Sequence, residues 1–256
     1  MDQNRLKEQL KKLTLHTILD IYEEEAKRAI KTKLSYSGYL ARLIEEEILA
    51  KTDRSINAKI AKAKFPWRKT IEEFDFKFQK SLDERLIREL AELSFLEKAA
   101  NILFVGAPGV GKTHLSIGLG IKACQARKRV LFTKAGELIE ELAICKFNRT
   151  LPQRLDLLSR LDCLIIDEIG YIPIQKEGAN LFFQLISRRY EHGSVIITTN
   201  KAFEEWGEVF GDDVIASAIL DRLLHHSHII PINGPSFRTH KKIDPKKKDQ
   251  KQLKNE

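Results

Sequence analysis

The chain has 256 residues, 43% of them apolar and 31% charged, and its 44 Lys and Arg against 36 Asp and Glu give a formal net charge of +8. This length predicts one or two domains with a sizeable core and excludes a miniprotein held together by disulfides. The three cysteines lack metal-ligand spacing, and no apolar run resembles a signal peptide or a membrane span, so we expect a cytoplasmic protein without membrane contact.

Residues 1–66 predict a small helical domain. Between Leu6 and Ala63 apolar side chains recur at helical spacing in two stripes, and the run 31–37 indicates a break between helices. These stripes either pack on each other or dock a partner protein. Because proline disfavours helix in the preceding residue, the domain is expected to end at Pro66.

Residues 67–236 alternate short apolar runs with helical segments. The expected strands are 102–105, 130–133, 164–166, 195–198 and 229–232, and the expected helices between the first four are 113–127, 136–147, 151–160 and 179–192. Continuous apolar strands separated by helices are typical of a parallel sheet covered on both faces. The predicted fold is therefore an α/β core with a five-stranded, mostly parallel sheet, preceded by the helical domain.

The first expected strand runs into a phosphate-binding loop. The pattern G-x-x-x-x-G-K-T is present in full, as Gly106-Ala107-Pro108-Gly109-Val110-Gly111-Lys112-Thr113. The glycines let backbone N–H groups turn toward phosphates, and the N-terminus of the following helix adds partial positive charge. Lys112 is expected to reach the β and γ phosphates of ATP, and the Thr113 hydroxyl to bind Mg²⁺.

Two adjacent carboxylates end the third expected strand. Asp167 is expected to join the Mg²⁺ shell, and Glu168 to polarise the water that attacks the γ phosphate. Asn200 follows the fourth strand, at the edge of the sheet where α/β folds bind ligands, and is either a turn residue or a group that holds the attacking water. This set predicts ATP hydrolysis. It suits a metabolic P-loop kinase less well, because no acceptor-binding lid is recognisable.

The arginines and histidines near the end of the core are less specific. Arg222 and Arg238 are candidates to pair with the γ phosphate, whereas cations at the end of a helix, such as Arg188 and Arg189, also complement its dipole. The cluster His225, His226 and His228 is followed at once by an expected strand. We therefore interpret these histidines as surface or interface residues and not as a metal site.

The positive charge lies at the two ends of the chain. Residues 1–80 and 237–256 each carry a net charge of +5, whereas residues 81–236 carry −2. Residues 237–256 are rich in lysine and predict a basic, disordered tail. A basic excess favours a polyanionic partner such as DNA, because lysine and arginine release counterions from phosphates, but it also serves solubility alone.

Together these motifs resemble the AAA+ ATPases and, more narrowly, the IstB-type transposition helpers of insertion sequences, close to the DnaC and DnaI helicase loaders. The resemblance covers nearly the whole chain. It rests on Phe74-Asp75-Phe76, Gly106–Thr113, Ile166-Asp167-Glu168-Ile169-Gly170-Tyr171, Arg189-Tyr190-Glu191, Thr198-Thr199-Asn200 with Trp206-Gly207-Glu208-Val209-Phe210, and Leu220-Asp221-Arg222-Leu223-Leu224-His225.

The resemblance implies further roles. The strand ending at Asn200 would lie between the phosphate-loop strand and the Asp167 strand, and Asn200 would sense the γ phosphate. Arg222 would be the finger that reaches a neighbouring subunit's site, with Arg189 a weaker candidate for such a contact. Arg238 resembles a second-sensor arginine, although about 25 residues after the last strand leave no room for a full helical lid.

The implied function is ATP-dependent assembly into a homo-oligomeric ring or spiral on double-stranded DNA, largely independent of DNA sequence, which recruits and activates the partner transposase. A replicative helicase loader is the alternative. Its core would be almost identical, so residues 1–66 are the part expected to distinguish the two partners.

Overall fold

The computed structural model describes residues 3–243, and the chain forms two compact units that divide between Ala58 and Lys59. The N-terminal unit contains α1 (Gln3–Lys12), α2 (His16–Lys31) and most of α3 (Tyr36–Lys62). The gap between α2 and α3 lies within the predicted break. In this unit Ile18 and Leu43 are buried, and the Glu47 carboxylate of α3 accepts a hydrogen bond of 3.0 Å from the Ile18 N–H of α2.

Residues 59–66 belong to the second unit, although the sequence placed them in the helical domain. Ala63 is fully buried there, and its carbonyl accepts a hydrogen bond of 2.8 Å from the N–H of Phe132. Phe65 packs edge-on against the Phe132 ring, with 6.3 Å between the ring centroids. The proline ends the helical pattern, but these contacts decide with which unit the residues before it pack.

A five-stranded sheet organises the second unit. Its strands are β1 (Asn101–Gly106), β2 (Val130–Lys134), β3 (Cys163–Ile169), β4 (Ser194–Thr199) and β5 (Ser227–Ile232). Their order is β2-β3-β4-β1-β5 and every neighbouring pair is parallel. The predicted five strands are confirmed, and β4 lies between β1 and β3 as the resemblance implied.

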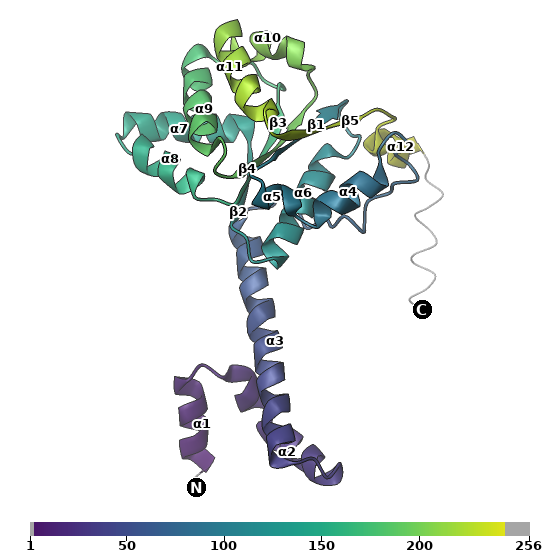
Figure 1. Ribbon diagram of the computed structural model, residues 1–256, viewed down its shortest axis with the longest axis vertical. Coiled ribbons are helices and arrows are strands. Elements are labelled where there is room, and N and C mark those ends of the chain that lie inside the picture. The colour runs from purple at the N-terminus through teal and green to yellow at the C-terminus, as the bar shows by residue number, and fades with distance from the viewer. Residues whose placement is uncertain (1–2, 244–256) are drawn as a thin grey trace. The chain divides into compact units, whose positions relative to one another are not determined.

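Helices cover both faces of the sheet, as predicted (Figure 1). One face packs against α4 (Glu84–Ala91), α5 (Ser94–Glu97) and α6 (Lys112–Gln125), and the other against α7 (Ala135–Phe147), α8 (Leu151–Ser159), α9 (Lys176–Arg189), α10 (Trp206–Phe210) and α11 (Asp213–Leu224). Successive strand residues point to opposite faces, so Ile102 enters the first core and Leu103 the second. Continuous apolar runs are therefore required by burial on both sides.

The start of the predicted disordered tail is helical. After β5 the chain forms α12 (Phe237–Ile243), and the Phe237 ring packs against Phe78 with 5.3 Å between centroids. The prediction of disorder is therefore wrong for residues 237–243, because an aromatic side chain anchors them. The rest of the predicted tail, 244–256, lies outside the described residues.

Among the described helices, none combines the length and the apolar character that a bilayer crossing requires.

Candidate functional site

The phosphate-binding loop connects the end of β1 to the start of α6, which is the predicted placement. Gly109 and Gly111 have φ angles of 85° and 108°, in the left-handed region that favours glycine. A Cβ at Gly111 would also collide with the Phe74 ring. The motif glycines thus serve both the backbone turn and the close approach of the segment that precedes the core.

Lys112 is held inside this loop. Its side chain is buried, and Nζ donates hydrogen bonds to the carbonyls of Gly106 at 2.5 Å and Ala107 at 2.8 Å. Burial lowers the pKa of Lys112 to about 8 against the attraction of Asp167, with a smaller contribution in the same direction from the nearby Arg238 guanidinium. Two cations near one loop would be stabilised by an anion such as a phosphate.

Asp167 joins two hydroxyl groups at the sheet edge. Thr113 Oγ1 donates to its carboxylate, with 2.9 Å to Oδ1 and 3.2 Å to Oδ2, and Thr198 Oγ1 donates to Oδ1 at 2.5 Å. Burial raises the pKa of Asp167 despite these bonds. A hydroxyl beside a buried carboxylate fits Mg²⁺, which prefers oxygen ligands and would favour the ionised carboxylate.

Glu168 is oriented by its backbone and by a lysine. It is a non-glycine residue with φ at 65°, and its N–H donates to Thr198 Oγ1 at 3.0 Å. Its carboxylate forms an ion pair of 2.9 Å with Lys134 Nζ at the end of β2. Left-handed backbone is uncommon at a non-glycine residue, and strained residues of this kind cluster at functional sites.

A cavity of about 360 Å³ lies beside the loop. Lys112, Thr113, Glu168 and Arg238 all line it, so the structure brings these four predicted residues together. Much of the remaining wall is aromatic or polar and includes Trp67, Phe74, Phe78, Gln79, His114, Tyr171 and Phe237. A pocket of this size, with aromatic walls and cations at one end, suits a nucleotide.

Asp167, Asn200 and Arg222 are not among the residues that line this cavity. Asn200 follows β4, and its buried Oδ1 accepts no hydrogen bond from the described part of the chain, which leaves it available to a ligand or water. Arg222 lies on α11, where it donates to the Ala218 carbonyl at 2.8 Å and stacks 4.8 Å from the centroid of the Phe183 ring. Within its own chain Arg222 therefore contacts α9 and not the phosphate-binding loop.

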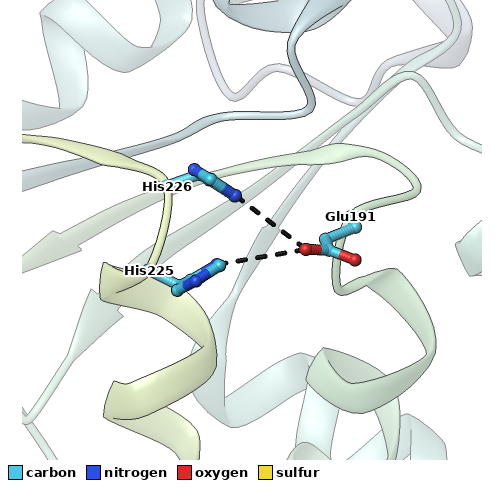
Figure 2. Close-up of side chains that lie close together, drawn as sticks. All are labelled: Glu191, His225 and His226. Carbon is cyan, nitrogen blue, oxygen red and sulfur yellow. Dashed lines mark ion pairs between the residues drawn. The ribbon is translucent and has the colours of Figure 1, made fainter.

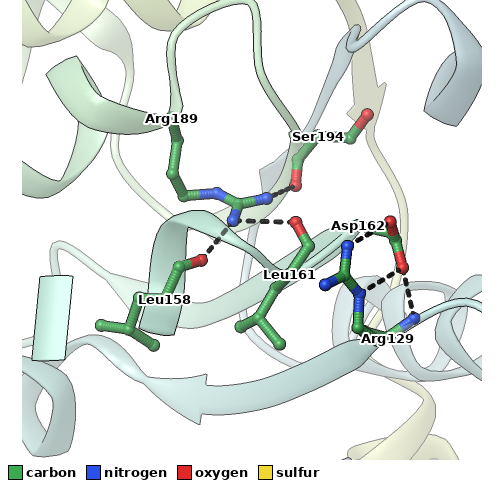
Figure 3. Close-up of polar contacts among 6 residues, drawn as sticks. All are labelled: Arg129, Leu158, Leu161, Asp162, Arg189 and Ser194. Carbon is green, nitrogen blue, oxygen red and sulfur yellow. Dashed lines mark hydrogen bonds and ion pairs between the residues drawn. The ribbon is translucent and has the colours of Figure 1, made fainter. Parts of the chain in front are cut away.

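Arg189 has a structural role, so its interpretation as an intersubunit contact is wrong. Only 1% of the residue is exposed, and its guanidinium donates to the carbonyls of Leu158 at 2.5 Å, Leu161 at 3.1 Å and Ser194 at 2.7 Å (Figure 3). Burial lowers its pKa to about 10. The preceding Arg188 is partly exposed.

The sequence interpretation missed Lys134 and Thr198. Thr198 had a weak signal, because it ends a strand two residues before Asn200. Lys134 had none, since it is one of 44 basic residues and only the parallel pairing of β2 with β3 sets it opposite Asp167. The sequence interpretation also assigned no role to the aromatic residues of the cavity wall, because Trp67, Phe74, Phe78 and Tyr171 come from loops without simple periodicity and Phe237 from the start of α12.

Comparisons with known proteins agree with this geometry. A family model described as IstB-like ATP-binding protein matches residues 8–245. An insertion sequence IS21 ATP-binding protein of Pseudomonas aeruginosa is 46% identical over 220 residues, which cover 86% of this chain and 83% of the relative. An insertion sequence IS5376 ATP-binding protein of Geobacillus stearothermophilus is 44% identical over 250 residues, which cover 97% of this chain and 100% of the relative.

Solved structures show the same fold at lower identity. The DnaC helicase loader matches with a TM-score of 0.51 and 23% identity, covering 59% of this chain and 88% of the loader. AMPPCP-bound DnaA from Aquifex aeolicus matches with a TM-score of 0.56 and 18% identity, covering 66% of this chain and 51% of DnaA. At these identities the likeness supports the fold alone, which is that of the AAA+ proteins.

Proposed function

Because the chain belongs to the family of IstB-like ATP-binding proteins, we propose that it is an AAA+ ATPase that assists transposition of an insertion sequence. It binds ATP, assembles into a homo-oligomeric ring or spiral on double-stranded DNA, and recruits and activates the transposase of the same element. The observation that carries the proposal is the convergence of Lys112, Thr113, Asp167 and Glu168 at one edge of the sheet.

The residues divide the chemistry among them. Lys112 Nζ leaves its hydrogen bonds with the loop carbonyls and binds the β and γ phosphates of ATP. Arg238 adds a second positive charge to the cavity. Thr113 and Asp167 hold Mg²⁺, which would neutralise phosphate charge when bound. Glu168 orients and deprotonates the attacking water, and Asn200 offers its unpartnered Oδ1 to the same water. Arg222 lies outside the cavity of its own chain and contacts the γ phosphate of the ATP bound to a neighbouring subunit.

A pair of variants tests hydrolysis separately from binding. Lys112→Ala should abolish ATP binding and ATP-dependent assembly, whereas Glu168→Gln should bind ATP normally and hydrolyse it ~10²–10⁴-fold more slowly, because only the base is removed. Glu204→Gln, an exposed carboxylate in another segment, is the matched control. Phosphate release measures hydrolysis, and sedimentation with ATP and DNA measures ATP-dependent assembly. Parental turnover in Glu168→Gln contradicts the assigned base.

DNA binding is proposed to arise from assembly. Each end of the chain carries a net charge of +5, and an oligomer repeats this modest excess along the phosphate backbone. Affinity for unrelated duplexes should therefore fall steeply with salt and depend on ATP. A chain that remains monomeric with ATP and DNA at low salt would refute this part of the proposal.

The relatives favour a transposition partner over a replicative helicase. The relatives named for insertion sequences are 44–46% identical over most of the chain, whereas the DnaC loader is 23% identical and supports only the fold. We propose that the N-terminal helical unit docks the transposase. Co-precipitation of transposase or helicase with the full chain, and with a chain lacking residues 1–58, distinguishes the two functions.

A further inference from the structure

A cluster outside the ATP site joins two histidines and a glutamate. His225 and His226 lie between the end of α11 and the start of β5, and Glu191 lies in the turn after α9 with φ at 60°. Glu191 Oε1 is 4.0 Å from His225 Nδ1 and 3.9 Å from His226 Nε2 (Figure 2). Among the described residues this is the single group of three or more His, Cys, Asp or Glu whose ligand atoms all lie within 4.8 Å of one another.

The separations are close to those of a metal site. Zinc ligands at ~2.0–2.2 Å in a tetrahedron lie ~3.3–3.6 Å from one another, so the two glutamate–histidine pairs must close by ~0.3–0.7 Å, and all three ligand atoms already lie within 4.8 Å of one another. The three side chains are between 51% and 56% exposed, so side-chain rotation can supply this movement. Solvent access leaves the fourth position to water or to a ligand from another molecule.

From this geometry we propose that Glu191, His225 and His226 form a binding site for a divalent transition-metal ion of the Zn²⁺, Ni²⁺ or Cu²⁺ class. Two imidazoles and one carboxylate select these ions over Mg²⁺, which takes oxygen ligands, so the site is chemically distinct from that of ATP. The histidine pair alone did not indicate a metal, because the third ligand comes from a turn that precedes β4 in the sequence.

Metal binding at this site changes a local hydrogen bond. Tyr190 OH lies 2.9 Å from His225 Nδ1, the same nitrogen that faces Glu191. A metal ion on Nδ1 replaces that contact and sets the Tyr190 hydroxyl free. Binding also links the end of α9 to the end of α11, three residues after Arg222, and so restrains the helix that carries this arginine.

Calorimetric titration of the full-length chain with ZnCl₂, in the presence of excess Mg²⁺, tests the site. We expect saturable binding of one Zn²⁺ per chain. His226→Ala and Glu191→Gln should each weaken it at least tenfold, and the His225→Ala/His226→Ala double variant should abolish it. His192→Ala is the matched control, because His192 is exposed and adjacent to Glu191 but outside the cluster, and it should bind as the parent does.

Two further measurements separate binding at this cluster from binding at a cysteine. Cys145→Ser should leave the affinity unchanged; its half-exposed thiol is more accessible to Zn²⁺ than the buried thiols of Cys124 and Cys163. The ultraviolet difference spectrum of tyrosine should change on binding in the parent and not in Tyr190→Phe. No saturable binding by the parent, or equal affinity in the parent and the double-histidine variant, would overturn the proposal.

Discussion

Replacement of Arg189 by methionine tests the buried contacts at the end of α9. The guanidinium makes three hydrogen bonds to carbonyls, and bonds with a charged donor each contribute ~1.5–3 kcal/mol. Burial opposes this: it lowers the pKa of Arg189 to about 10, which corresponds to a cost of about 3 kcal/mol. We therefore expect Arg189→Met to lower the free energy of unfolding by about 3 kcal/mol.

Thermal unfolding of the full chain measures this loss. At about 2–4 °C per kcal/mol for a unit of this size, the melting temperature should fall by ~6–12 °C. Arg188→Met is the matched control and should shift it little, because its side chain is partly exposed. Arg189→Lys should recover part of the loss, because lysine keeps a charged donor. The recovery should be incomplete, because an ammonium cannot bridge three carbonyls as the planar guanidinium does. A melting temperature of Arg189→Met equal to that of the parent would refute the structural role.

Three more predictions concern charged groups. Lys134→Met should raise basal ATP hydrolysis ~2–5-fold, because it releases Glu168 from an exposed ion pair of about 0.5–1 kcal/mol. Lys134→Arg keeps the ion pair and is the control. Slower phosphate release in Lys134→Met would show instead that Lys134 orients the base. The pKa of Lys112 is lowered to about 8, and bound phosphates would raise it again, so ATP binding above pH 8 should take up a proton and should weaken as pH rises. Calorimetry in buffers of different ionisation enthalpy detects the proton uptake. Binding without proton uptake would contradict the shifted pKa. Burial opposes ionisation of Glu47, but hydrogen bonds and nearby cations lower its pKa overall. Glu47→Gln should therefore speed amide exchange of Ile18 at neutral pH, and the difference from the parent should vanish as Glu47 protonates in acid. A difference that persists in acid would exclude a role for the charge.

The sequence alone was sufficient to predict the core and most of the residues that the structure brings together at the candidate ATP site. The phosphate-binding loop is one continuous segment, so its residues are neighbours in any fold that contains it, and the Asp167-Glu168 pair ends a strand that its apolar run identifies. Strand positions were predictable because burial on both faces requires uninterrupted apolar residues. The resemblance to AAA+ proteins then supplied the position of β4 between β1 and β3.

Local patterns could not decide the contacts made by single charged residues. Arg188 and Arg189 are chemically identical neighbours, yet a step of one residue turns a helix by about 100°, which buries one and leaves the other partly exposed. The sheet register sets Lys134 opposite Asp167, and its side chain reaches Glu168, 34 residues later.

The same reason applies to the cluster of Glu191 with His225 and His226. Those side chains are separated by more than thirty residues and meet because α9 and α11 pack on the same face of the sheet. The spacing of residues along the chain thus determined the fold class and the phosphate-binding loop. Tertiary packing determined which distant charges lie close enough to interact, since an interaction between side chains depends on their separation in space and on their burial.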